Sequence, residues 1–252
     1  MEENSSYQWA AGWFGSSNVL VTGGTSGIGA AVTRAFLLAG AKVTAAGVTQ
    51  DELDRVRSDA PFASAALEVL DVRDGKAVSA LIASLPALDI LVNCAGIIRR
   101  GDELDPSVFE QVIDVNLNGT MRCCAAARPL LARSTNGAIV NLASMLSVFG
   151  GGLVPGYAAS KGGVSQLTKS LAIAYAPDAI RVNAVAPGWI ATPLTQALRD
   201  DPDRSDAILA RTPLRRWGRA DDVASAVLYL CSPVAAFVTG TTLVVDGGYS
   251  IS

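Results

Sequence analysis

Short apolar runs rich in β-branched residues alternate with longer helical patterns along almost the whole chain. Strands are expected at residues 17–24, 40–47, 65–72, 88–96, 137–144, 180–188 and 240–248, and helices at 27–39, 74–84, 106–132, 156–176 and 220–231, with a bend near Gly119. Continuous apolar strands separated by helices are typical of a parallel sheet covered on both faces. The sequence therefore predicts an α/β fold, a doubly wound sheet of seven parallel strands.

No linker-like stretch and no repeat interrupts this pattern, so one domain is expected over residues 1–252. Residues 189–219 lack strand character and are expected to form an inserted substrate lobe near the strand ends, where ligands bind in such sheets. The segment "MEENSSYQWAAGWFGSS" starts acidic and lacks the charged-then-apolar pattern of a signal peptide. Trp9, Trp13 and Phe14 within it are expected to pack, with a neighbouring subunit as one possible place.

The chain contains no histidine, the side chain that most often exchanges protons near neutral pH. The spacing of Cys94, Cys123, Cys124 and Cys231 fits neither a zinc site nor a disulfide framework, so no metal is expected. The net charge is −3, with no basic stripe for nucleic acid and no apolar run of the ~18 residues that span a bilayer. We expect a cytoplasmic protein whose partner is a small molecule, neither nucleic acid nor membrane.

Glycines cluster between the first expected strand and the first expected helix, in "VTGGTSGIG". Gly23, Gly27 and Gly29 permit a tight turn, close backbone approach and close helix packing, while the first amides of the helix face a pyrophosphate. The spacing is G-x-x-x-G-x-G rather than the common G-x-G-x-x-G. Because glycine turns also occur for purely structural reasons, the position between strand and helix is what favours a nucleotide site.

Polar residues end the third and fourth expected strands. Asp71 is either a turn former or an acceptor for an adenine amino group, because strand ends line the crevice of such sheets. In "NCAG", Asn93 can hold the loop by bonding backbone groups, and Gly96 lets a ligand approach. Both strand ends are therefore candidates for the same nucleotide site.

Six features now appear in order and at familiar spacing: "TGGTSGIG", "NCAG", "VNLNG", Ser144, "YAASK" and "PGWIAT". On these the chain is identified as a member of the short-chain dehydrogenase/reductase family, a resemblance that runs from Val19 nearly to the C-terminus. It implies a single-domain Rossmann fold that binds NAD or NADP. Cys94, where the family usually has a second Asn, and the aromatic N-terminal segment depart from the pattern. The candidate cofactor residues are Gly23, Thr25, Ser26, Gly27, Ile28, Gly29, Asp71, Val72, Asn93, Ala95, Gly96, Tyr157, Lys161, Pro187, Gly188, Ile190 and Thr192.

The choice between the two nucleotides has no clear signature in the sequence. Gly47 stands where the family's acidic residue would bind the ribose 2′-hydroxyl of NAD, and Thr25 and Ser26 stand where NADP-binding members often carry a base. Binding NADP without a base would bury an unpaired phosphate dianion, which costs more free energy than binding NAD without an acid. NAD(H) is therefore favoured, and NADP(H) is the alternative.

Tyr157 and Lys161 lie four residues apart, on one face of an expected helix start. An isolated pair of this kind is usually just an exposed aromatic and a cation, but Ser144 closes the preceding strand. A nearby ammonium favours the phenolate, so we expect Lys161 to lower the pKa of Tyr157 and make it a proton donor and acceptor. The resemblance implies that Lys161 also binds the nicotinamide ribose, that Ser144 holds the substrate oxygen and that Asn116 positions a water. It further implies that Ile190 and Thr192 bind the carboxamide.

Arg99 and Arg100 follow the fourth expected strand, close to the crevice. Surface arginines are usually solvated, yet Arg is the natural clamp for a planar carboxylate. Longer stretches such as "CAGIIRRGDELD" resemble the bacterial sugar-acid branch of the family, which implies a hydroxyl–ketone conversion on 2-dehydro-3-deoxy-D-gluconate or gluconate. The candidate substrate residues are Arg99, Arg100, Ser144, Ser147, Trp189 and Gln196.

Two other functions share this pattern. Reduction of 3-oxoacyl thioesters carried by acyl carrier protein is the enzymatic alternative, although it would favour NADPH and a basic patch. A non-catalytic protein that senses the cofactor is the alternative from another class, and it could dispense with Ser144, Tyr157 and Lys161. The helices over 106–132 and 156–176 and the apolar C-terminal end resemble those through which family members form homotetramers, a closed symmetric assembly.

Overall fold

The computed structural model describes residues 7–252 and contains one seven-stranded sheet, in the order β3-β2-β1-β4-β5-β6-β7. Every neighbouring pair of strands is parallel. The strands are β1 (Asn18–Thr22), β2 (Lys42–Gly47), β3 (Ala66–Val69), β4 (Ile90–Asn93), β5 (Ala138–Leu142), β6 (Arg181–Pro187) and β7 (Thr242–Val245). All seven expected strands are therefore present, each shorter than its expected range because the strand ends belong to loops.

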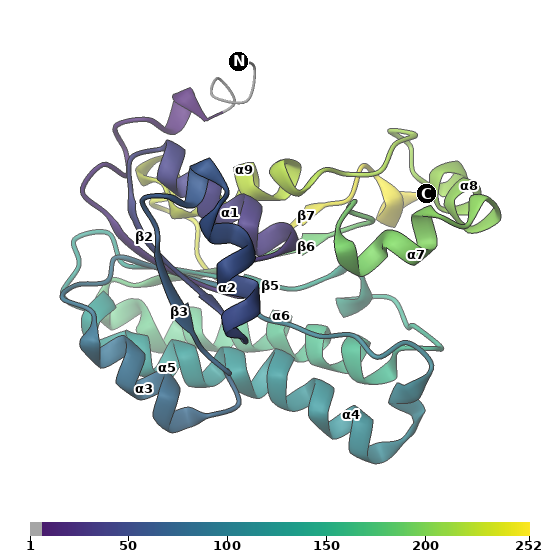
Figure 1. Ribbon diagram of the computed structural model, residues 1–252, viewed down its shortest axis with the longest axis horizontal. Coiled ribbons are helices and arrows are strands. Elements are labelled where there is room, and N and C mark those ends of the chain that lie inside the picture. The colour runs from purple at the N-terminus through teal and green to yellow at the C-terminus, as the bar shows by residue number, and fades with distance from the viewer. Residues whose placement is uncertain (1–6) are drawn as a thin grey trace.

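Helices cover both faces of this sheet (Figure 1). They are α1 (Gly27–Leu38), α2 (Gln50–Arg57), α3 (Gly75–Ser84), α4 (Pro106–Ile113), α5 (Gly119–Leu131), α6 (Pro155–Tyr175), α7 (Gln196–Arg199), α8 (Pro202–Arg211) and α9 (Ala220–Cys231). A π-helical turn over Asp114–Asn118 joins α4 to α5, close to the expected bend at Gly119. The predicted doubly wound fold is confirmed, and no helix in the described part is long and apolar enough to cross a membrane.

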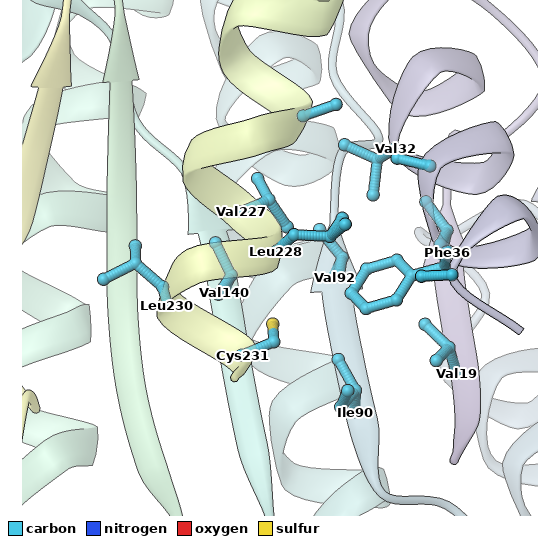
Figure 2. Packing of buried hydrophobic residues seen from close by; sticks show 14 of the residues in the cluster. Val19, Val32, Phe36, Ile90, Val92, Val140, Val227, Leu228, Leu230 and Cys231 are labelled. Atoms are coloured by element: carbon cyan, nitrogen blue, oxygen red, sulfur yellow. The ribbon is translucent and has the colours of Figure 1, made fainter. Parts of the chain in front are cut away.

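The larger core cluster lies between the sheet and the helices α1 and α9 (Figure 2). Helix α9 presents Val227 and Leu228 to the sheet residues Val92 and Val140, and α1 adds Phe36 from the other side. The second cluster lies on the opposite face, between the sheet and α3, α5 and α6. With both faces of the central strands buried, function is left to the ends of the strands.

The aromatic N-terminal segment packs on its own chain rather than requiring a neighbouring subunit. Phe14 is fully buried, and its ring lies edge-on to Phe36 of α1 with 5.1 Å between centroids. The Tyr7 hydroxyl donates to Asp221 of α9 at 2.8 Å. The segment therefore links α1 to α9. The acidic residues at the start of the sequence lie outside the described residues.

Two features of the fold were not expected from the sequence pattern. Helix α2 has one buried residue, Leu53, and is otherwise polar, so its apolar periodicity is too weak to recognise. The expected lobe at 189–219 contains the short helices α7 and α8, the latter started by the Asp201–Pro202 pair. Asp201 caps α8 by accepting from the Arg204 amide.

Candidate active site

A cavity of about 900 Å³ opens at the carboxyl ends of the strands, around the point between β1 and β4 where the strand order reverses. Ligands bind at this point in doubly wound sheets. The loops that follow β1, β3, β4, β5 and β6 all contribute to its wall. Of the residues predicted for the site, all but Asn93, Asn116, Ser147 and Gln196 line this cavity.

The glycine turn after β1 leaves no room for side chains. Gly23 has a φ of +63°, and a Cβ there would lie 2.7 Å from the backbone of Ala95. A Cβ on Gly29 would lie 2.0 Å from the carbonyl oxygen of Gly23. Ser26 precedes α1 without capping it through its side chain, so the first turn of the helix faces the cavity. This bare, amide-rich cradle fits a pyrophosphate.

The far end of the cavity is lined by Asp71, Val72 and Arg73 after β3. Arg73 donates to both carboxylate oxygens of Asp71, at 2.6 to 3.0 Å. That hydrogen bond lowers the pKa of Asp71, while burial raises it less. Glu52 of α2 also lines the cavity, although the sequence pattern did not predict it as a site residue.

Asn93 does not face the cavity, in contrast to the prediction. Its amide donates to Asn141 of β5 at 2.9 Å and to the Cys124 sulfur at 3.3 Å, beneath the sheet. Side chains alternate along a strand, so a residue that ends β4 with its neighbour Cys94 toward α1 must itself point toward α5. Asn93 supports the strand end from below, and Ala95 and Gly96 form the surface above it.

The segment "PGWIAT" closes the cavity over the glycine turn. A Cβ on Gly188 would lie 2.6 Å from the Cβ of Asp246, so this turn packs tightly against the C-terminal loop. The Thr192 side chain would lie 3.6 Å from a Cβ on Gly27, which places it over the start of α1. Pro187, Gly188, Ile190 and Thr192 thus lie together, as the resemblance implies.

Lys161 is a buried cation, 4 % exposed, on the second turn of α6. Its Nζ donates to the carbonyl of Leu142 at 2.7 Å and lies 5.5 Å from the centre of the Tyr157 ring. Burial lowers the pKa of Lys161 to about 8. A group whose pKa lies this close to neutral pH is suited to a proton-transfer site.

The expected lowering of the Tyr157 pKa by Lys161 is wrong for this arrangement. Burial raises the pKa of the phenol, a hydrogen bond with Ser144 lowers it, and the Glu103 carboxylate raises it again, for a net upward shift. The physical reason is placement, because the Lys161 ammonium is itself desolvated and donates to Leu142. The phenol is therefore held in its protonated form at neutral pH.

Ser144 ends the loop after β5 next to Tyr157, as predicted, but Ser147 is turned away from the cavity. The Ser147 hydroxyl donates to the carbonyl of Lys161 at 2.7 Å and accepts from the Ser144 amide at 3.3 Å. It fixes the one-turn helix Met145–Ser147 against α6 instead of reaching a ligand. The predicted substrate contact of Ser147 is therefore wrong, because the hydroxyl is used within the fold.

Asn116 lies in the π-helical turn, fully buried. Its Oδ1 accepts from the Ile97 amide at 2.8 Å, while its Nδ2 donates to the Ile97 carbonyl at 3.0 Å and to the Ser160 hydroxyl at 3.1 Å. The side chain ties the loop after β4 to α6, one residue from Lys161. Its implied role in positioning a water stays a prediction.

Glu103 is a buried carboxylate that the sequence reading missed. One oxygen accepts from the Arg99 amide and the other from the Tyr157 amide, each at 2.7 Å. Val154 precedes α6 and its side chain cannot cap the helix, so Glu103 supplies an acceptor at the positive end of α6. Glu103 thus joins the loop of Arg99 to the helix that carries Tyr157.

Three arginines line the cavity besides Arg73. Arg99 and Arg100 are exposed there, as predicted. Arg211, at the end of α8, was not expected, and its guanidinium lies 5.2 Å from the Phe149 ring centre and 4.2 Å from that of Tyr249. Stacked between two rings, it is a pre-oriented cation.

Trp189 lines the cavity as predicted, with its ring edge-on to Tyr249 at 6.1 Å. Gln196 does not line it. The Gln196 amide donates to Asp200 at 2.7 Å and accepts from Arg199, on the exposed side of α7. The predicted substrate contact of Gln196 is therefore wrong in this structure, because α7 turns Leu198 inward instead.

Comparison with known proteins agrees with this geometry. Residues 23–250 match a family model described as enoyl-(acyl carrier protein) reductase. The chain is 41% identical over 239 residues to galactitol 2-dehydrogenase (L-tagatose-forming) of Cereibacter sphaeroides, covering 92% of this chain and 94% of that protein. It is 38% identical over 236 residues to 2-dehydro-3-deoxy-D-gluconate 5-dehydrogenase of Bacillus subtilis, covering 91% and 93%.

A solved structure extends the likeness to three dimensions. The gluconate 5-dehydrogenase of Burkholderia cenocepacia, in complex with NADP and tartrate, superposes with a TM-score of 0.87 at 34% identity. The match covers 94% of this chain and 96% of that one. The glycine cradle, the strand-end crevice and the Ser144, Tyr157 and Lys161 cluster therefore belong to a nucleotide-binding oxidoreductase.

Proposed function

The chain belongs to the short-chain dehydrogenase/reductase family, and from that premise we propose that it transfers a hydride between a nicotinamide nucleotide and a secondary alcohol or ketone of a sugar acid. The bound nucleotide would supply or accept the hydride, held by the glycine turn, Asp71, Val72 and the segment from Pro187 to Thr192. The single observation that carries the choice of substrate is that Arg99, Arg100 and Arg211 line the same cavity as Ser144, Tyr157 and Lys161.

We assign the proton transfer to Tyr157. Its phenol is kept protonated by burial, and in that form it donates to a carbonyl oxygen that becomes an alcohol. The Ser144 hydroxyl beside it holds the same substrate oxygen. Lys161 would bind the nucleotide ribose and pass protons outward through a water that Asn116 positions, while residues 189–219 form the substrate lobe.

Three solved relatives hold NADP, which supports a pyridine nucleotide as the cofactor. For this chain we infer that NAD(H) is the preferred nucleotide and NADP(H) the alternative. The support is electrostatic, because the end of β2 carries Gly47 and no base, and an unpaired phosphate dianion is costly to desolvate.

The substrate carboxylate is assigned to Arg99 and Arg100, with Arg211 as a third cation. We expect Arg99→Ala or Arg100→Ala to raise the KM for 2-dehydro-3-deoxy-D-gluconate or gluconate about 10- to 100-fold, the loss of a hydrogen bond to a charged group. The KM for galactitol, a neutral polyol, should change little. Steady-state kinetics with both substrate types would measure the difference.

Arg133→Ala is the matched control, since Arg133 is exposed and does not line the cavity. The carboxylate assignment fails if both cavity variants leave the KM of every sugar acid unchanged. Turnover of 3-oxoacyl esters without turnover of any sugar acid would favour the 3-oxoacyl reductase alternative, which is the named activity of one relative.

We also propose a homotetramer in the cytoplasm. Apolar side chains are exposed on the outer helices, Met121 on α5 and Ile173 on α6, and near the sheet edge, Phe237 and Val244. All four cysteines are free thiols, as suits a reducing compartment. Solution scattering should give four times the chain mass of 25.9 kDa, and a monomer would contradict the assembly.

A further inference from the structure

The carboxylate of Glu52 lies at the end of β2, against the position that a side chain on Gly47 would take. A Cβ on Gly47 would lie 2.7 Å from the Thr25 hydroxyl, 2.9 Å from the Leu53 side chain and 3.0 Å from Oε2 of Glu52. An acid on the strand at this position would require Thr25, Leu53 or Glu52 to shift. The space beside Gly47 is occupied by an acid from the next helix.

Glu52 is held there by the way α2 begins. Thr49 caps the helix by accepting from the Glu52 amide at 3.3 Å, and Oε2 of Glu52 accepts from the Val48 amide at 2.9 Å. The same Oε2 lies 3.4 Å from the Thr25 hydroxyl of the glycine turn. The first contact anchors the Glu52 backbone and the other two hold Oε2, while Oε1 has no hydrogen bond to the residues that the structure describes.

The arginines nearest to the Glu52 carboxylate are engaged with other groups, so its negative charge is not neutralised by an ion pair. Arg73 lines the cavity next to Asp71, and its guanidinium already donates to both carboxylate oxygens of Asp71. On α2 itself, Arg55 donates to the Asp51 carbonyl and Arg57 pairs with Asp54, outside the cavity. A phosphate dianion placed beside Gly47 would meet the Glu52 carboxylate, while the guanidinium of Arg73 is already paired with Asp71.

We propose that Glu52 selects the nucleotide, by accepting hydrogen bonds from the adenosine ribose hydroxyls of NAD(H) and by repelling the 2′-phosphate of NADP(H). This rests on the proposed nucleotide-dependent function and names the residue that decides its cofactor. Glu52 takes over from the helix the task that an acid at the strand end performs elsewhere. The placement explains why neither cofactor signature was visible in the sequence around Gly47.

Direct binding tests the proposal without turnover. The Kd values of NADH and NADPH would be measured by nucleotide fluorescence and calorimetry for the wild type, Glu52→Gln and Asp51→Asn. Glutamine can also serve at this position of a helix start, so Glu52→Gln removes the charge and keeps the cap. Asp51→Asn removes the same charge from the adjacent exposed residue, which does not line the cavity.

We expect the wild type to bind NADH at least tenfold more tightly than NADPH. Glu52→Gln should tighten NADPH binding about tenfold, and Asp51→Asn should leave the ratio of the two Kd values within about twofold. Equal affinities in the wild type, or an unchanged ratio in folded Glu52→Gln, would overturn the role of Glu52. A wild type that binds neither nucleotide would instead overturn the proposed function.

Discussion

Replacing Tyr157 by phenylalanine should lower kcat by about 10²- to 10⁴-fold, the range that a positioned general acid contributes. The ring stays in place, so the wall of the cavity and the packing around Lys161 are retained. What disappears is the hydroxyl that exchanges a proton with the substrate oxygen and bonds Ser144. The Kd of the nucleotide should stay within about twofold, since the glycine cradle is untouched.

Tyr229→Phe supplies the matched control, because Tyr229 is a partly exposed tyrosine on α9 that does not line the cavity. Steady-state kinetics and nucleotide titration on both variants separate chemistry from binding. Substantial turnover by Tyr157→Phe would remove Tyr157 from the mechanism. A wild type that binds nucleotide but turns over no alcohol or ketone would instead favour a cofactor-sensing protein.

The raised pKa of Tyr157 changes how the site has to be understood. A phenolate would be ready to accept the hydroxyl proton of an alcohol whose hydride goes to the nucleotide, whereas a phenol is ready to donate a proton to the oxygen of a carbonyl that the nucleotide reduces. Glu103 contributes to that state and also holds the Tyr157 amide. The buried carboxylate therefore positions the tyrosine and keeps its proton on, and its other oxygen binds the backbone of Arg99.

The parts of this molecule that could be predicted are those in which local pattern and burial agree. Each central strand is apolar on both faces, as "ILVN" of β4 illustrates, and a run of this kind has few alternatives inside a sheet. The glycine turn could be predicted for the same reason. Gly29 abuts the carbonyl of Gly23, a residue only six positions away, so the requirement is written in one short segment.

The residues that were misplaced are polar side chains whose direction depends on the tertiary structure. Ser147 and Gln196 were expected to reach a ligand, but each has a nearer partner within the fold, Lys161 O and Asp200. Both residues do belong to segments that line the cavity. The competition from internal hydrogen bonds could not be read from one segment.

The residues that were missed come from segments remote from the motifs. Arg211 reaches the cavity because α8 ends where Phe149 and Tyr249 meet, a junction of three separate parts of the chain. Glu52 had a local signal, the T-x-x-E pattern of Thr49 and Glu52 at a helix start. That pattern locates the start of α2, but only the packing of α2 against β2 brings the carboxylate to Gly47.

Lys161→Met should make the protein inactive and, at pH 7, more stable. The folded-state pKa of Lys161 is about 8, against 10.5 for an unburied lysine, so keeping the charge inside the fold costs about 3 kcal/mol below pH 8. Methionine has a similar length and no charge. After allowance of about 1–2 kcal/mol for the lost hydrogen bond to Leu142, a gain of about 1–2 kcal/mol in the free energy of unfolding is expected.

The sign of the pH dependence distinguishes this cost from a simple packing effect. Between pH 8 and 10.5 the unfolded chain binds a proton at Lys161 that the folded chain has released, so wild-type stability rises with pH across that window. The advantage of Lys161→Met should therefore be full below pH 8 and fall within that window. By about pH 10.5 the wild type should be the more stable protein, by the ~1–2 kcal/mol of its hydrogen bond to Leu142. Denaturant unfolding at several pH values, with the exposed Lys169→Met of the same helix as control, would measure it. The prediction fails if Lys161→Met is less stable than the wild type at pH 7 by an amount that does not depend on pH. In that case the buried ammonium stabilises the fold, instead of destabilising it and being retained for catalysis.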